Sequence, residues 1–256
     1  MKQYVDQMGR IVNLPLMPQR IISLVPSQTE WLLDLGLSSQ VIGITRYCLY
    51  PENLVRNKTI VGGTKHLNFE VIRQLQPDLI IGNKEENDKI QINELEQQFP
   101  VWMSDITRIE DAYQMMEAIA EITGKKAHAA VLMQEVTEAL KKVKNCLKGK
   151  RVAYIIWRKP YMAVGKQTYI NSLLEWMGAE NVFLHQPRYP TFNLLDLKAL
   201  QPDYIMLSSE PYAFSEKHFD EFREAAGAYS EVCLVDGERM SWYGSRMRYL
   251  INPLPL

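Results

Sequence analysis

The segment RIISLVPSQTEWLLDLG, residues 20–36, decides the fold class. Its apolar, β-branched first part predicts a buried strand over residues 20–25. Ser27 and Glu30 follow at the three-residue spacing of a capping box, which predicts that a helix begins here. Gly36 predicts the helix end, because glycine readily adopts the left-handed conformation that terminates helices. A strand followed at once by a helix is the unit from which parallel sheets are built.

Downstream segments repeat this order. Short apolar strands are expected over residues 41–44 and 79–81, and a helix between them is closed by Pro77. Alternating strands and helices are typical of a parallel sheet that carries helices on both faces. We therefore predict an α/β fold with a central, mostly parallel sheet. The expected helix has apolar residues at helical spacing: Phe69, Val71, Ile72 and Leu75.

Two short patterns occur once in each half of the chain. LQPDLI at residues 75–80 recurs as LQPDYI at residues 200–205, in both cases where a helix is expected to turn into a strand. LLD before Gly36 has a counterpart in LLE before Gly178. Two matches in the same order predict two similar lobes.

A helical segment lies between the two halves, over residues 107–148, and is interrupted once at Gly124. Beyond that glycine the apolar residues keep to one helix face for about 23 residues, or about 35 Å at the helical rise. We therefore expect a stiff helical connection with a ligand cleft between the lobes. The predicted boundaries are an N-terminal lobe over 1–124, a connecting backbone helix over 125–148 and a C-terminal lobe over 149–256.

Composition excludes several classes of protein. The 29 basic and 30 acidic residues give a net charge of −1, without the positive field that nucleic acids require. No apolar run approaches the roughly 18 residues of a membrane span. Three cysteines without close spacing are expected to be structural thiols. The N-terminal residues have no signal-peptide pattern, which leaves open a cytoplasmic protein or a chain whose signal has been removed.

The motifs together resemble a known family. Residues 20–30 with Gly36, residues 61–63 leading to residues 68–70, and the paired Leu-Gln-Pro-Asp segments are similar to those of class III substrate-binding proteins of ABC importers. Among well-known members, those that bind vitamin B12 look most similar, and residues 178–183 and 241–245 look like second-lobe features. The resemblance implies a non-enzymatic, periplasmic or cell-surface monomer without an intrinsic cofactor. It implies two partners, an ABC permease and a metal chelate, either cobalamin or another corrinoid, a ferric siderophore or haem.

Candidate ligand contacts lie in the loops that follow the apolar strands, because ligands of parallel α/β folds bind outside the carboxyl ends of strands. Aromatic faces match a flat macrocycle, and cations match its carboxylates or a catecholate oxygen. The competing interpretation is that the rings only cover strand ends. These loops also carry Tyr50, Lys84 and Glu86. The predicted contacts are Tyr47, Cys48, Lys65, His66, Asn83 and Glu85 in the first lobe, and Trp157, Arg158, Tyr161, Arg188, Tyr189, Trp242, Tyr243 and Arg246 in the second.

The four histidines do not converge in the predicted fold, which disfavours a receptor for a bare metal ion. Only His66 lies on a loop at the expected cleft. His66 or Cys48 is a candidate axial ligand to a chelated metal, against the simpler interpretation of surface or packing roles. Where the vitamin B12-binding members of the family present tryptophans on the first lobe, this chain has Thr64 and Asn83, so cobalamin specificity does not simply carry over.

The resemblance also implies a docking site for the permease. Glu70 holds the position of a lobe-surface glutamate that contacts permease arginines in this family, and it also suits a helix start. Its second-lobe counterpart is Leu195, with Asp196 beside it as the substitute anion. Enzyme motifs are not convincing, since Lys166 in a Gly-Lys loop is not followed by Ser or Thr. The alternative function is a cytoplasmic corrinoid- or tetrapyrrole-handling protein, sensor or enzyme on the same scaffold.

Overall fold

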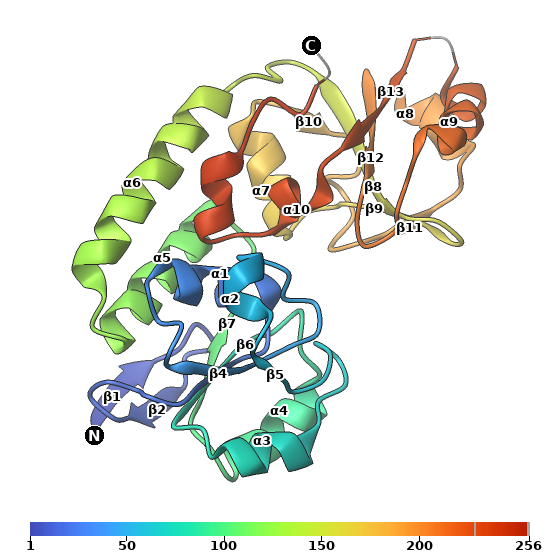
Figure 1. The fold of residues 1–256 in the computed structure, drawn as a ribbon. Helices are drawn as coiled ribbons and strands as arrows, with labels where there is room; N and C mark the ends of the chain where they lie inside the picture. Colours follow the sequence, from blue (N-terminus) through green and yellow to red (C-terminus); the bar gives the residue numbers. More distant parts are fainter. Residues whose placement is uncertain (228, 255–256) are drawn as a thin grey trace. The chain divides into compact units, whose positions relative to one another are not determined.

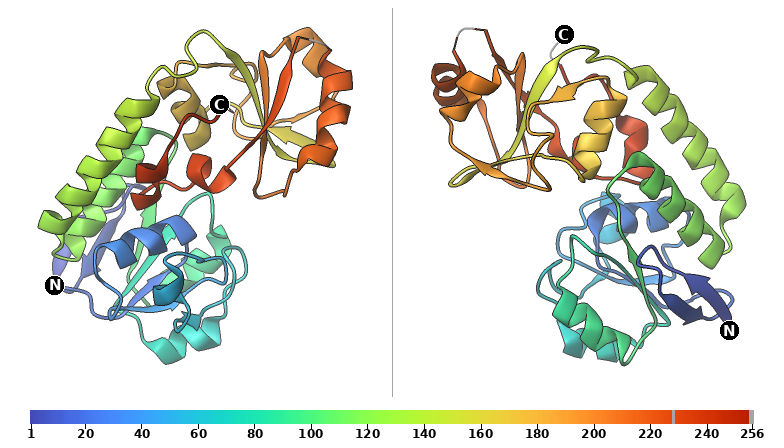
Figure 2. Two further views of the ribbon diagram at one scale, coloured as in Figure 1. Left: turned by 45° about the horizontal axis from the view of Figure 1, so that its top comes forward. Right: turned by 180° about the vertical axis from the view of Figure 1, so that it is seen from behind.

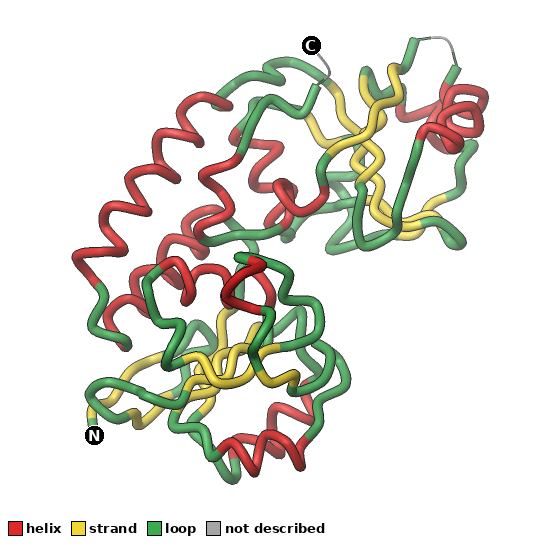
Figure 3. The backbone as a smooth tube through the Cα atoms, viewed as in Figure 1, coloured by secondary structure: helices red, strands yellow, loops and turns green. Residues whose placement is uncertain are grey.

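The computed structural model describes residues 1–227 and 229–254, and the chain forms two compact α/β units (Figure 1). The first unit comprises Met1–Ile106, Glu110–Val136 and Tyr243–Arg246. The second comprises Thr107–Ile109, Thr137–Trp242 and the residues from Met247 on. Figure 3 shows that the strands of each unit gather into a sheet with helices around it.

The first unit is built on a five-stranded sheet in the order β5-β4-β3-β6-β7, with every pair parallel. The expected strands at residues 20–25, 41–44 and 79–81 are confirmed. Helices α3 and α4 cover one face of the sheet, and α1 and α5 the other (Figure 1). The strands are β3 (Ile21–Ser23), β4 (Val41–Ile44), β5 (Thr59–Ile60), β6 (Leu79–Asn83) and β7 (Val101–Ser104); the helices are α1 (Pro26–Asp34), α2 (Glu52–Val55), α3 (Phe69–Leu75), α4 (Lys89–Glu96) and α5 (Ile109–Ile122).

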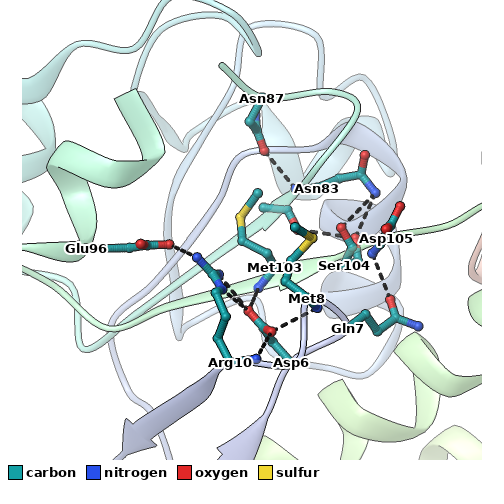
Figure 4. A network of polar contacts seen from close by, with 11 residues as sticks. Asp6, Gln7, Met8, Arg10, Asn83, Asn87, Glu96, Met103, Ser104 and Asp105 are labelled. Carbon is teal, nitrogen blue, oxygen red and sulfur yellow. Dashed lines mark hydrogen bonds and ion pairs between the residues drawn. The ribbon is translucent and has the colours of Figure 1, made fainter. Parts of the chain in front are cut away.

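An antiparallel hairpin of β1 (Lys2–Val5) and β2 (Ile11–Leu14) precedes this sheet. Asp6, at the hairpin turn, has a fully buried side chain that accepts hydrogen bonds from the backbone N–H groups of Met8 and Arg10, both at 2.9 Å, and of Met103 at 3.3 Å. Figure 4 shows this network. The Nζ atom of Lys2 in β1 also pairs with Glu121, near the end of α5, at 2.7 Å. Figure 2 shows the hairpin near the N-terminus, in dark blue. The hairpin is therefore tied to the outer strand β7 by a buried carboxylate.

The second unit has a mixed sheet in the order β11-β9-β8-β12-β13, with β10 also paired to β8. Strands β8, β10, β12 and β13 are parallel, whereas β9 and β11 join antiparallel. The strands are β8 (Arg151–Trp157), β9 (Tyr161–Ala163), β10 (Glu180–Asn181), β11 (Thr191–Phe192), β12 (Tyr204–Ser208) and β13 (Glu231–Val235); the helices are α7 (Tyr169–Trp176), α8 (Asp196–Leu200), α9 (Phe219–Ala226) and α10 (Gly237–Ser241), with 3₁₀ turns η1 (Glu216–His218) and η2 (Ser245–Tyr249).

The repeated Leu-Gln-Pro-Asp pattern forms the same local structure in both units. Gln76 and Gln201 each end a helix with φ of +45°. In the first unit, Asp78 accepts a hydrogen bond from the backbone N–H of Arg20 at 2.8 Å, and the guanidinium of Arg20 donates to the carbonyl of Gln76 at 3.0 Å. The corresponding second-unit distances, from Arg151 to Asp203 and to Gln201, are 2.7 and 3.2 Å. Each unit thus fixes its helix end to the start of its first parallel strand with the same residue types.

The start of α1 differs from the prediction. The helix begins at Pro26, and the N-cap position is Val25, which makes no side-chain cap. Proline suits the first helical position because its missing N–H would have had no partner there. The predicted Ser27–Glu30 capping box is therefore wrong. The predicted end is confirmed, since Gly36 has φ of +76°.

The helical segment between the halves consists of α5 and α6 (Lys126–Val143), separated at Gly124 with φ of +69°. Helix α6 has 18 residues and ends before the predicted residue 148. The chain turns there, and the backbone N–H of Leu147 donates to the carbonyl of Met177 at 2.8 Å. The buried Leu147 therefore packs in a turn rather than on the helix.

Candidate functional site

The carboxyl end of the first sheet exposes two tyrosines. Tyr47 and Tyr50 lie on the loop after β4, with 53% and 37% of their surface exposed. The ring of Tyr47 lies over Gly63, where a Cβ atom would come within 3.2 Å of the tyrosine Cε2. Lys65 and His66 are exposed on the neighbouring loop. This end of the first unit therefore exposes two aromatic rings together with a lysine and a histidine.

Asn83 lies below this surface and is only 2% exposed. Its amide nitrogen donates to Ser104 Oγ at 2.9 Å, and its oxygen accepts from the backbone N–H groups of Glu85 at 2.8 Å and Glu86 at 3.1 Å. Figure 4 shows Asn83 between Ser104 and Asn87. The predicted ligand contact at Asn83 is corrected: its carboxamide shapes the turn that carries the half-buried Glu85 and the exposed Glu86.

Cys48 also lies beneath the surface. Its Sγ donates to Thr29 Oγ1 at 3.1 Å and lies 3.4 Å from Thr45 Oγ1. Burial raises the pKa of the Cys48 thiol above its ordinary value. Because Cys48 is only 6% exposed and its thiol is engaged by two hydroxyl groups, the structure does not present it to a ligand, either as a contact or as an axial ligand.

The segment Tyr243–Arg246, which the sequence boundaries place in the C-terminal lobe, belongs to the first unit. Gly244, with φ of +99°, lets the segment approach α1, since a Cβ there would lie 3.6 Å from Trp31 Cβ. Tyr243 is buried, and burial raises the pKa of its phenol. Tyr243 therefore anchors the segment from below and is not an exposed ligand contact.

Arg246 has a partner that the sequence did not reveal. Its Nε and Nη2 donate to the two carboxylate oxygens of Glu30 at 2.7 and 3.2 Å, and the side chains are only 11% and 4% exposed. Its guanidinium carbon lies 3.8 Å from the centre of the Tyr50 ring. The predicted role of Arg246 as a charged ligand anchor is corrected, because Glu30 already neutralises its charge.

In the second unit, Trp157 ends β8 with 38% of its surface exposed and meets the edge of Tyr212 at 5.8 Å between ring centres. Arg158 donates to both carboxylate oxygens of Glu221, at 2.9 and 2.7 Å. Tyr161 packs against Phe222 at 5.7 Å within the apolar core. Trp157 remains a candidate contact, whereas Arg158 and Tyr161 have structural partners.

Three further predicted residues lie on other loops of the second unit. The half-buried Arg188, with φ of +58°, donates to the carbonyl of Gln167 at 2.7 Å, and its guanidinium lies over the Tyr189 ring at 5.8 Å. Trp242 Nε1 donates to Glu210 Oε1 at 2.9 Å. Sequence reasoning missed Glu210, although an acidic residue two positions after an apolar strand was an available signal. Burial raises the pKa of Glu210.

The two predicted docking carboxylates occupy comparable places in the repeated helices. Glu70 is exposed in the first turn of α3, after the N-cap Asn68. Asp196 is exposed at the start of α8, and its Oδ2 accepts from the backbone N–H of Asn193 at 3.0 Å. The neighbouring Leu195 is 73% exposed. Both carboxylates therefore remain accessible from solvent on their own unit.

The histidines are dispersed. His218 is buried and accepts at Nδ1 from the backbone N–H of Ser215, whereas His66 is exposed. Across residues 1–227 and 229–254, no group of three or more His, Cys, Asp or Glu side chains is arranged to hold a metal ion. Among the described helices, none has both the length and the apolar character needed to cross a membrane.

Comparison with known proteins supplies the family. The model described as "Periplasmic binding protein" matches residues 21–229. The chain belongs to this family of periplasmic binding proteins. An ABC transporter substrate-binding lipoprotein of Bacillus subtilis, YvrC, is 25% identical over 94% of this chain and 80% of its own. The vitamin B12-binding protein of Vibrio campbellii is 28% identical over 74% of this chain and 70% of its own.

Solved structures confirm the two-lobed α/β fold of this family member. The periplasmic vitamin B12-binding protein of Vibrio cholerae superposes with a TM-score of 0.79 at 21% identity, covering 92% of this chain and 94% of that one. The petrobactin-binding protein of Bacillus subtilis gives a TM-score of 0.82 at 17% identity, covering 97% and 94%. A haem-binding protein of Pseudomonas aeruginosa gives 0.75 at 19%, covering 91% and 89%. At these identities the likeness concerns the fold.

Proposed function

We propose that this periplasmic binding protein captures a metal chelate, either a corrinoid, a ferric siderophore or haem, and delivers it to an ABC permease. The observation that carries the proposal is the exposure of aromatic rings at the carboxyl ends of strands in each unit. Tyr47 and Tyr50 follow β4 in the first unit, and Trp157 ends β8 in the second. Large exposed rings at the ligand-binding end of an α/β sheet suit a flat, largely apolar guest.

The charge around the tyrosines supports an anionic or carboxylate-bearing ligand. Lys65 and His66 are exposed on the loop after Gly63, and Lys65 donates to a backbone carbonyl, that of Glu85, whereas Arg246 and Arg158 are paired with carboxylates. We therefore assign the anchoring of ligand carboxylates or catecholate oxygens to Lys65, with His66 as the candidate axial ligand. A chelate brings its own metal coordination, so it requires no cluster of protein ligands.

Transport is favoured over the alternative of a cytoplasmic corrinoid-handling protein. The relatives are periplasmic binding proteins and a lipoprotein of an ABC transporter, and the family is of the solute-binding type. We propose that this chain likewise acts outside the cytoplasmic membrane as a non-enzymatic monomer. Glu70 on α3 and Asp196 on α8 are its proposed contacts with permease arginines, because both are exposed on corresponding helices of the two units.

A visible-absorption titration tests the ligand class. Purified protein is mixed with cyanocobalamin, haemin or a ferric tris-catecholate, and the shift of the ligand's absorption bands is followed against protein concentration. We expect saturable one-to-one binding of one of the three. If none of the three spectra changes at micromolar protein, the proposed function is refuted.

Single substitutions then test the site. Tyr47→Ala and Trp157→Ala are each expected to weaken binding about three- to tenfold, the range of one aromatic contact. The matched control is Tyr229→Ala, since Tyr229 is 96% exposed in the second unit and lies outside the candidate site. Equal affinities for all three variants would place the ligand elsewhere.

A further inference from the structure

The Glu30–Arg246 pair is a buried ion pair with two hydrogen bonds inside the first unit. Glu30 lies in the middle of α1, and Arg246 lies 216 positions later in η2. Both donor–acceptor distances, 2.7 and 3.2 Å, join a planar guanidinium to a planar carboxylate. This two-point geometry fixes the plane of the guanidinium as well as its position.

The fixed guanidinium plane has an aromatic neighbour. The Arg246 Cζ atom lies 3.8 Å from the centre of the Tyr50 ring, well inside the limit of about 6 Å for a cation–π contact. Tyr50 lies on the loop after β4, three positions from Tyr47, and keeps 37% of its surface exposed. A surface tyrosine on a loop would otherwise sample several rotamers. The contact with Arg246 restricts this ring.

The backbone around Arg246 is itself held in place. Gly244 passes within van der Waals distance of α1, where a Cβ would lie 3.5 Å from the Ser27 carbonyl oxygen. Tyr243 and Ser245 on either side of it are buried. The guanidinium is therefore positioned from two directions, by the carboxylate and by its own segment.

We infer that Glu30 and Arg246 are positioning residues that hold the Tyr50 ring in the orientation used to contact the ligand. The inference rests on the proposed function, since it assigns a role at the same site. Arg246 acts through Tyr50 and not on the ligand, because its charge is engaged by Glu30. A planar ligand that contacts the exposed part of Tyr50 would then meet a ring that is already held in one orientation, so less conformational freedom is lost on binding.

A double-mutant cycle tests this inference with the ligand identified by the absorption titration. Arg246→Lys keeps the positive charge near Glu30 but removes the planar group, and it is measured alone and in a Tyr50→Leu background. We expect Arg246→Lys to weaken binding about three- to tenfold alone and less than twofold when Tyr50 is already replaced. An equal loss in both backgrounds, or no loss in either, would overturn the inference.

A second measurement needs no ligand. With 3-fluorotyrosine incorporated, the ¹⁹F resonances of Tyr50 and Tyr47 are assigned from the Tyr50→Phe and Tyr47→Phe variants. We expect Arg246→Lys and Glu30→Gln to shift or broaden the Tyr50 resonance and to leave Tyr47 unchanged. An unmoved Tyr50 resonance would overturn the inference even if no ligand had been found, so its failure is distinguishable from failure of the proposed function.

A matched control separates this role from a general effect of replacing arginine. Arg73 pairs with Glu94 at 3.3 Å and lies over the Phe69 ring at 5.7 Å in the same unit, but both charged side chains are well exposed. Arg73→Lys should change neither the affinity nor the Tyr50 resonance. If Arg246→Lys does not fold, Glu30→Gln takes its place in the cycle with the same expected outcomes.

Discussion

Replacing Asp6 tests how much a single buried carboxylate contributes to the stability of the first unit. The side chain is fully buried and accepts from the backbone N–H groups of Met8, Arg10 and Met103 and from the guanidinium of Arg10. In Asp6→Ala these donors lose their acceptor. Arg10 is partly exposed and also pairs with Glu96, so its guanidinium is readily solvated.

The magnitude follows from the remaining donors. The Met103 N–H is buried between the hairpin and β7, and leaving it unsatisfied costs about 1–3 kcal/mol. The N–H groups of Met8 and Arg10 lie at a turn that water can reach, and each contributes about 0.5–1 kcal/mol. We therefore expect Asp6→Ala to lower the free energy of unfolding by about 3 kcal/mol, whereas Asp6→Asn, which keeps one acceptor oxygen, should lose less.

Urea unfolding followed by circular dichroism measures the free energy, and native-state hydrogen exchange locates it. The amides of Met8, Arg10 and Met103 should lose protection before those of β3 and β6. The control is Asp220→Ala, because Asp220 is 87% exposed in a surface pair with Arg223 and should change stability by less than about 0.5 kcal/mol. A loss below about 1 kcal/mol in Asp6→Ala, or unchanged protection of Met103, would refute the reasoning.

Three further predictions concern other residues. Burial raises the folded-state pKa of Glu210 above the ordinary 4.5, so the stability that this group contributes should be lost as pH rises through the folded pKa. Glu210→Gln should remove this loss when Tm is measured over a series of pH values. The same dependence of Tm on pH in the wild type and the variant would contradict the prediction. Iodoacetamide should modify the half-buried Cys146 before the buried Cys48, as read by mass spectrometry, and the reverse order would be inconsistent with the burial described. Gly62→Ala should lower the free energy of unfolding by more than about 1 kcal/mol, because Gly62 has φ of +115° and the new Cβ would lie 2.9 Å from the Cα of Leu67. A variant with the same Tm as the wild type would contradict this prediction.

Local patterns predicted local structure well. Gln76 and Gln201 are followed by proline and aspartate, and the aspartate accepts from a backbone N–H near the start of the adjacent strand in each unit. The end of α1 at Gly36 was equally predictable, because a glycine in the left-handed conformation terminates a helix through contacts within a few residues. Such features depend on neighbours in sequence.

The start of α1 could not be predicted in the same way. Glu30 has the spacing of a capping-box residue from Ser27, but its carboxylate binds a guanidinium 216 positions away. The competition between a local cap and a distant partner is decided by tertiary packing. For the same reason the sequence boundaries did not assign Tyr243–Arg246 to the first unit.

The sequence predicted which loops carry exposed side chains better than it predicted which residues on those loops are exposed. Tyr47, Lys65 and Trp157 are exposed at strand ends or in adjoining loops, as expected, whereas Asn83 and Cys48 lie at equivalent positions but beneath the surface. Residue type does not distinguish these outcomes, because an asparagine after a strand can either face solvent or shape the following turn. Only the packing of several loops together determines which.

The chain order of the Glu30–Arg246 pair has a consequence for biosynthesis. All five strands of the first sheet have left the ribosome once residue 104 and its exit-tunnel length have been translated, and N-terminal units generally fold first. Glu30 then still lacks the Arg246 guanidinium, which lies 216 positions later in the sequence. The nascent first unit therefore forms this ion pair only after all strands of the second sheet have been synthesised, and a premature stop just before Arg246 would harm the part of the protein that was made earliest.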